Sequence, residues 1–66
     1  MQMKNLQRIR KEKGISQSEL SKISDVNVRM IQKYEIGAKD INKASALTVY
    51  KLSLALGVNV SDLLEL

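Results

Sequence analysis

The stretch SQSELSKISDVNVRMIQKYEIG, residues 16–37, decides the fold of this chain, because it carries the signals for two short helices joined by a tight turn. Ser16 and Glu19 have the spacing of a capping box, in which each side chain accepts a hydrogen bond from the other residue's backbone amide. A helix therefore begins at this point. We expect it to end at Ser24–Asp25, because aspartate is one of the few residues other than glycine that tolerate a left-handed conformation.

The second helix of this stretch begins after Asn27, a residue type that caps helix N-termini, and runs to Glu35 or Ile36, where Gly37 closes it. Apolar residues at helical spacing give the two helices a shared inward face, made of Leu20, Ile23, Val26 and Ile31. Two short helices joined across a turn of about three residues have the pattern of a helix-turn-helix, whose second helix enters the major groove of DNA.

The flanking segments predict three more helices. One runs from about Lys4 to Lys13, with Leu6 and Ile9 inward, and Gly14 ends it. Another runs from near Asn42 to Leu56 and ends at Gly57, and its expected inward residues are Leu47, Tyr50 and Leu54, with Val49 as a further candidate. A last short helix follows the N-cap candidate Asn59, with Asp62 three residues on, and carries Leu63, Leu64 and Leu66. The expected fold is all-α, a single compact domain of five helices over residues 1–66.

Composition narrows the function. The 66 residues include no Cys and no His, which removes disulfides, thiolate nucleophiles, imidazole chemistry and the usual zinc sites. No glycine loop that could cradle phosphate is present either, so we expect no enzyme, no cofactor and no metal, and no small-molecule ligand is indicated. Apolar runs are too short for a membrane span and no apolar leader opens the chain, which favours a cytoplasmic protein. A net charge of +4 favours a polyanionic partner.

Arg10 and Glu35 are the two charged residues expected to face inward, Arg10 on the apolar side of the first helix and Glu35 on that of the third. A charge on an inward face needs a partner, so we expect them to form a structural ion pair. Lys4 and Lys11, two further basic residues of the first helix, are expected on a solvated face.

Three stretches of the sequence resemble the phage-repressor family of helix-turn-helix proteins, which includes Cro/CI and Xre-like regulators: LQRIRKEKGISQSEL (6–20), VNVRMIQKYEIG (26–37) and TVYKLSLALGVNVSDLL (48–64). The resemblance implies a lambda-repressor-like fold, the Arg10–Glu35 bridge, and a transcriptional regulator of the repressor type. The chain departs from the family in having Asp25 where glycine is usual, a longer connection after Gly37, and no proline in that connection.

The third helix contains the candidates for reading DNA bases. With Ile31 and Tyr34 facing the core, its outward face is centred on Arg29, Gln32, Lys33 and Ile36. Arginine can bind guanine through two hydrogen bonds, glutamine can bind adenine in the same way, and lysine can reach guanine or phosphate. Val28, near the helix start, offers a thymine-methyl contact or none. The alternative for the polar residues is an ordinary solvated face.

Phosphate contacts are expected on both sides of the third helix. Ser16 and Gln17 begin the second helix, where free amides and the positive end of the helix dipole attract anions. The resemblance implies that Gln17 and Asn27 bond backbone phosphates. The remaining candidates precede or open the fourth helix: Lys39, Asn42 and Lys43. Capping alone is the alternative for Ser16 and Asn27, and plain solvation for the other three.

We expect a homodimer on a palindromic operator in double-stranded DNA, because one recognition helix reads only a few base pairs. A helix of one or two turns cannot bury Leu63, Leu64 and Leu66 on one side, so Leu64 and Leu66 are the candidate dimer contacts. The alternative function is an antitoxin or another protein-interaction module that binds DNA mainly to regulate its own synthesis.

Overall fold

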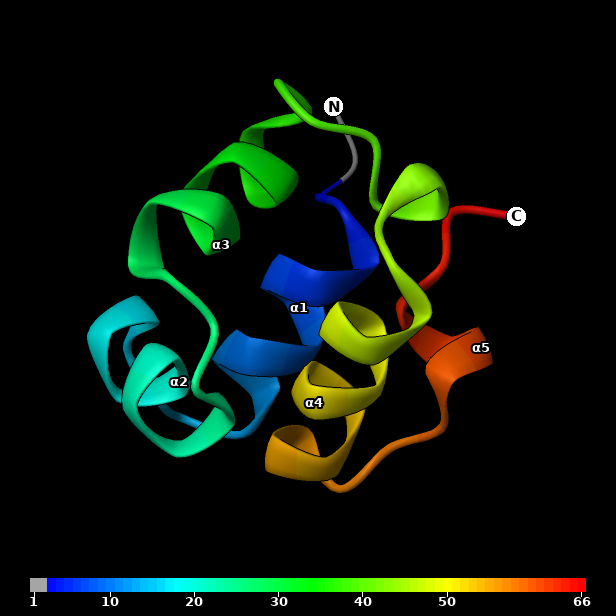
Figure 1. The fold of residues 1–66 in the computed structure, drawn as a ribbon. Coiled ribbons are helices and arrows are strands. Elements are labelled where there is room, and N and C mark those ends of the chain that lie inside the picture. The colour runs from blue at the N-terminus through cyan, green and yellow to red at the C-terminus, as the bar shows by residue number, and fades with distance from the viewer. Residues whose placement is uncertain (1–2) are drawn as a thin grey trace.

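The helix boundaries follow local capping signals along the chain. The computed structural model describes residues 3–66, and within them it contains helices and no strand: α1 (Asn5–Glu12), α2 (Gln17–Ser24), α3 (Val28–Ile36), a 3-10 turn η1 (Ile41–Lys43), α4 (Ala46–Leu56) and α5 (Val60–Leu63). The all-α, five-helix expectation is therefore confirmed. In Figure 1, α2 and α3 lie on one side of the molecule and α5 on the opposite side, with α1 and α4 between them.

The caps expected for the two central helices are present. The amide of Glu19 donates to Ser16 Oγ over 3.0 Å, and the amide of Ser16 donates to the Glu19 carboxylate over 3.1 Å. Asp25 ends α2 with a φ of 61°, and Asn27 Oδ1 accepts a 2.8 Å hydrogen bond from the amide of Arg29. The turn between α2 and α3 is thus fixed by bonds within a few residues of the chain.

The fourth helix begins later than the expected start near Asn42. Asp40 accepts a hydrogen bond from the amide of Asn42 and starts η1, which ends after one turn because Ala44 is extended, with ψ of 156°. Ser45 then caps α4, accepting from the amide of Thr48 over 3.1 Å. Two successive side-chain caps therefore divide the expected helix into a short turn and α4.

The core lies where α2 packs against α3 and α4, and where α1 and α5 close the other side. Its buried apolar side chains are Leu6, Ile9, Leu20, Val26, Ile31, Tyr34, Ile41, Val49, Leu52, Leu56 and Leu63. The inward positions expected for Leu6, Ile9, Leu20, Val26, Ile31 and Val49 are thus confirmed. Every helix contributes to one continuous core, as a chain of this size requires.

Four residues expected to face inward are exposed instead. Ile23 is 61% exposed, and the outward side of α4 consists of Leu47, Tyr50 and Leu54, exposed by 61, 53 and 63%. On α2 the inward position belongs to Ser24, whose hydroxyl donates to the Leu20 carbonyl over 2.6 Å and so needs no water. On α4, apolar residues occur all round the helix, so packing against α2 and α5 selected which side is buried.

A buried ion pair joins α1 to α3. Arg10 Nε lies 2.7 Å from Glu35 Oε2, and Arg10 Nη2 donates to Glu35 Oε1 over 2.9 Å. Arg10 Nη1 donates to the Ile15 carbonyl, and Gln17 Nε2 donates to Glu35 Oε1 over 2.9 Å, so α2 is tied to the same pair. The hydrogen bond to Glu35, aided by its charge, raises the pKa of Arg10 above its ordinary value.

The C-terminal residues are held by two asparagines. Asn5 Nδ2 donates to the Leu64 carbonyl, and the Asn5 amide donates to the Glu65 carboxylate over 2.6 Å. Asn42 Nδ2 donates to the Glu65 carbonyl and Asn42 Oδ1 accepts from the Glu65 amide, each over 2.8 Å. The segment after α5 is therefore fixed to both α1 and η1.

Replacing Glu35 with alanine should leave most of the protein unfolded at room temperature. The substitution strands the buried Arg10 guanidinium, at a cost of about 3–5 kcal/mol, which matches the whole stability expected of so small a core. Urea unfolding followed by circular dichroism measures this. Glu12→Ala is the matched control, because it removes a carboxylate from an exposed pair with Arg8 and should change the free energy of unfolding by under about 1 kcal/mol. A cooperative transition of Glu35→Ala near the parent's midpoint would contradict the structural role of the pair.

Candidate nucleic-acid interface

The outward face of α3 presents three polar side chains to solvent. Arg29, Gln32 and Lys33 are exposed, while Ile31, Tyr34 and Glu35 on the other side of the helix are buried. Within residues 3–66, none of the three outward side chains forms a hydrogen bond or an ion pair with another side chain. Their donors are therefore available to an external partner. We call this set the recognition face.

Two apolar residues border the recognition face. Val28, the first residue of α3, is half-buried, so only part of its side chain can meet a partner. Ile36, the last residue of the helix, is 76% exposed. A partner that approaches the polar residues would contact apolar surface at both ends of the helix.

The start of α2 is occupied by its own capping groups. The Ser16 hydroxyl accepts a hydrogen bond from the amide of Glu19, and the Glu19 carboxylate accepts one from the amide of Ser16. Gln17 is half-buried, and its amide nitrogen donates one hydrogen to Glu35. Because a carboxamide nitrogen carries two hydrogens, Gln17 retains one donor for an anion. The sequence did not predict this bond between Gln17 and the buried ion pair.

Asn27 combines a cap with a free donor. Its Oδ1 accepts from the amide of Arg29, and its Nδ2 has no hydrogen-bond partner among the residues that the structure describes. Asn27 is exposed at the start of α3, beside the recognition face. The side chain can therefore cap α3 and donate to an anion at the same time.

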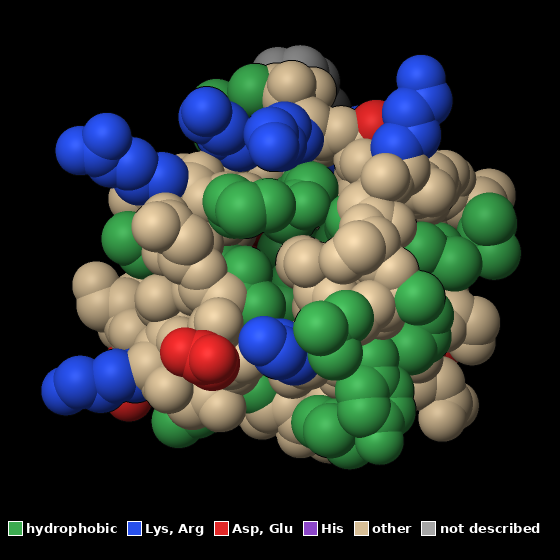
Figure 2. Space-filling view, in the orientation of Figure 1, with side chains coloured by type: hydrophobic (Ala, Val, Ile, Leu, Met, Phe, Trp, Pro, Cys, Tyr) green, Lys and Arg blue, Asp and Glu red, His purple; other side chains and the backbone are tan. Residues whose placement is uncertain are grey.

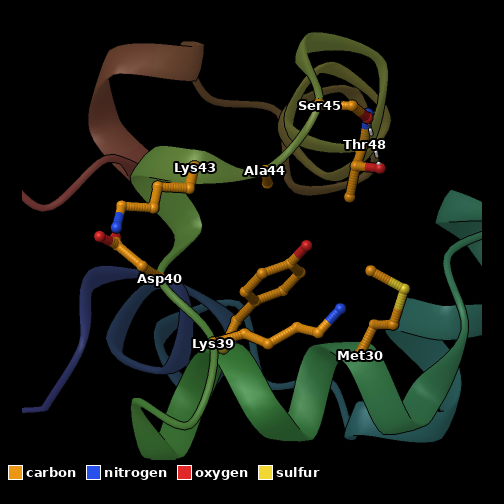
Figure 3. Close-up of a pocket in the computed structure, with 8 residues that line it drawn as sticks. Met30, Lys39, Asp40, Lys43, Ala44, Ser45 and Thr48 are labelled. Atoms are coloured by element: carbon orange, nitrogen blue, oxygen red, sulfur yellow. Dashed lines mark hydrogen bonds between the residues drawn. The ribbon is translucent and has the colours of Figure 1, made fainter.

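Two of the three candidates in the connection before α4 have side chains that form no hydrogen bond or ion pair within residues 3–66. Lys39 and Lys43 are exposed, and both line a hollow of about 410 Å³ between α3 and the start of α4 (Figure 3). Asn42 lies elsewhere, because its side-chain oxygen and nitrogen both bond to the main chain of Glu65. Asn42 thus holds the C-terminal segment, and it lines a second hollow with Lys39 but without Lys43.

An apolar surface lies apart from the recognition face. It consists of Leu47, Tyr50 and Leu54 on the outward side of α4, with Val60 of α5, and we call it the α4 surface. Figure 2 shows hydrophobic side chains gathered over α4, while Lys and Arg side chains project near α3 and the loop that follows it. The sequence contained one signal for this surface, namely that α4 has more apolar residues than one inward face can use.

The three C-terminal leucines have different surroundings. Leu63 is fully buried, and Leu64 is half-buried and packs against the core. Leu66 is 97% exposed. Of the two candidate dimer contacts, only Leu66 therefore presents its whole side chain outward.

Two kinds of site are absent from the described part of the chain. Residues 3–66 contain no group of three or more Asp, Glu, Cys or His side chains placed to hold a metal ion. No helix in this range has the length and apolarity needed to cross a membrane.

Comparison with known proteins gives one match. A family model described as helix-turn-helix matches residues 6–63, which covers α1 to α5 almost completely. Neither the comparison with curated proteins nor the one with solved structures finds a match.

The capping role of Ser16 can be measured without any partner. Ser16→Ala removes the acceptor for the Glu19 amide and should lower the free energy of unfolding by about 1 kcal/mol. Ser18→Ala is the control, because Ser18 is exposed on the same helix and its side chain makes no hydrogen bond within residues 3–66. Urea titrations of both variants give the comparison, and equal midpoints would show that the capping box does not stabilise α2.

Proposed function

Because this chain belongs to the helix-turn-helix family of Cro/CI and Xre-like DNA-binding regulators, we propose that it is a sequence-specific transcriptional repressor that binds a palindromic operator as a homodimer. The observation that carries this proposal is the recognition face, where Arg29, Gln32 and Lys33 are exposed together and have no partner within the described chain. A helix of this kind can enter the major groove with its donors directed at base edges.

Each residue of the recognition face has a proposed role. Arg29 binds a guanine through two hydrogen bonds, Gln32 binds an adenine, and Lys33 reaches a guanine or a phosphate. Val28 makes a thymine-methyl contact, limited by its partial burial. Such contacts discriminate between bases by about 1–3 kcal/mol per base pair.

Phosphate contacts on the two sides of α3 hold the helix in register. Ser16, Gln17 and Asn27 lie at the starts of α2 and α3, where the free donors of Gln17 and Asn27 and the helix N-termini favour a negative charge. Lys39 and Lys43 supply positive charge from the connection to α4. These contacts give affinity that falls with salt and carry no base sequence of their own.

The α4 surface supports the proposed dimer. Leu47, Tyr50 and Leu54 form a continuous apolar side of one helix, which is larger than the contribution of Leu66 alone. Two chains related by a twofold axis would place their recognition helices in half-sites about 10–10.5 base pairs apart. Repression then requires only that the bound dimer occludes a promoter. The α4 surface is also the feature that favours the second candidate function, an antitoxin that covers this surface with a partner protein.

Arg29→Ala should weaken binding to the cognate operator by about 1–3 kcal/mol and relax the base preference at one position, while binding to random DNA changes by far less. Selection of bound sequences from a random DNA pool supplies the operator, and fluorescence anisotropy measures both affinities. Arg8→Ala is the control, because it removes the same charge from an exposed position on α1. Equal loss on operator and random DNA would show that Arg29 contacts phosphate rather than a base.

Leu54→Asp and Leu66→Asp test the dimer. If the α4 surface joins two chains, Leu54→Asp should place one chain on the operator at concentrations where the parent places two, because a buried charge opposes the interface. Leu66→Asp shows whether Leu66 belongs to the same interface. Ile23→Asp is the control, with the same charge change at an equally exposed residue of α2. Sedimentation of the protein–DNA complex gives the stoichiometry, and one parent chain per palindromic operator would rule out the dimer.

A further inference from the structure

The hollow between α3 and the start of α4 has the chemistry of an anion site. Three segments line it: Met30 and Tyr34 from α3, then Lys39, Asp40, Lys43 and Ala44 from the connection, and Ser45 and Thr48 at the start of α4 (Figure 3). Two lysines and one aspartate line it, which leaves one net positive charge. The carboxylate of Asp40 accepts a hydrogen bond from the amide of Asn42, so part of its charge is already compensated.

Tyr34 brings an unpaired donor to this hollow. The residue is only 5% exposed, and its hydroxyl has no hydrogen-bond partner among residues 3–66. Within the same range no side-chain oxygen is both fully buried and unpaired, so the hydroxyl must reach solvent, and Tyr34 lines the hollow. A tyrosine in an apolar core gains nothing from a hydroxyl unless that group meets water or a ligand.

The start of α4 supplies further donors. The Ser45 hydroxyl accepts from the amide of Thr48 and donates its own hydrogen to Thr48 Oγ1 over 2.9 Å. The Thr48 hydroxyl therefore accepts a hydrogen bond, and its own hydrogen is free to point elsewhere. Thr48 lines the hollow at the N-terminus of a helix of 11 residues, where the helix dipole favours a negative charge.

The hollow lies next to the recognition face. Met30 follows Arg29 in the chain and Tyr34 follows Lys33. The side of α3 that lines the hollow is therefore rotated by about 100° from Arg29 and Lys33. A DNA strand that borders the groove entered by α3 would pass along this side. An anion in the hollow would then be part of the DNA backbone.

We propose that this hollow binds one phosphate of the DNA backbone, with the Tyr34 and Thr48 hydroxyls as hydrogen-bond donors and Lys39 and Lys43 as the neighbouring charges. This inference rests on the proposed DNA binding. It assigns Tyr34 two roles, because the ring packs in the core and the hydroxyl contacts the phosphate. The ligand is a phosphodiester, and free phosphate is the competing source of the same chemistry.

Tyr34→Phe removes only the hydroxyl. Ser61→Ala is the control, because Ser61 carries an exposed hydroxyl on α5, lies outside the hollow and makes no side-chain hydrogen bond within residues 3–66. Tyr34→Phe should weaken binding about tenfold, equivalent to about 1.4 kcal/mol, on the selected operator and on a random-sequence 20-base-pair duplex alike. The slope of log affinity against log salt should stay the same, because a neutral donor releases no counterion. Lys39→Ala should reduce that slope by about one unit. Ser61→Ala should bind as the parent does.

The outcomes separate this inference from the proposed function. If the parent binds duplex DNA and Tyr34→Phe binds equally well, the phosphate site is wrong and the proposed function stands. If the parent binds no duplex DNA, both the phosphate site and the proposed function are wrong. The unfolding midpoint of Tyr34→Phe should equal the parent's, and a large decrease would show that the hydroxyl is structural. Titration with inorganic phosphate, followed by the amide resonances of Ser45 and Thr48, tests the other source, and saturation at micromolar phosphate would assign the hollow to a free anion.

Discussion

The ion pair between Arg10 and Glu35 sets the position of everything that faces outward on α3. Two charges buried in a small apolar core are costly unless each finds its full set of partners, and here the guanidinium forms two bonds to Glu35 and one to the Ile15 carbonyl. Glu35 lies on the inward side of α3, so its bond to α1 fixes the rotation of that helix. The same rotation directs Arg29, Gln32 and Lys33 to solvent.

Gln17 extends this constraint to the second helix. Its bond to Glu35 links the start of α2 to α3, in addition to the apolar contacts of Leu20 and Ile31. Polar bonds between segments are used again at the other end of the molecule, where Asn5 and Asn42 hold Leu64 and Glu65. A core of this size buries little apolar area, so apolar packing alone fixes the segments weakly. Hydrogen bonds between segments provide the additional constraint on their positions.

The fourth helix serves three parts of the molecule at once. Val49, Leu52 and Leu56 complete the core, the opposite side forms the α4 surface, and the first turn closes the hollow that Tyr34 lines. In the proposed function these parts correspond to stability, dimerisation and phosphate contact. The separation of the recognition face from the α4 surface allows one chain to meet DNA and a second chain together.

The sequence by itself determined the features that depend on a few neighbouring residues. The capping box of Ser16, the left-handed Asp25 and the Asn27 cap are set by local backbone bonds, so their positions followed from residue types alone. The meeting of Arg10 with Glu35 could also be inferred, because an inward charge requires an opposite charge. The outward position of the recognition face also followed from the sequence, because helical geometry places it opposite Ile31 and Tyr34.

The tertiary structure alone decided which side of each helix is buried when the pattern is ambiguous. The apolar residues of α4 surround the helix, and only its contacts with α2 and α5 put Leu52 inside and Leu47 outside. The surroundings of Asn42 and Tyr34 could not be predicted from neighbouring residues either. Asn42 bonds to Glu65, and Tyr34 lines a hollow that the start of α4 completes. Local hydrogen bonds are encoded within a few residues, whereas burial results from the simultaneous packing of all five helices.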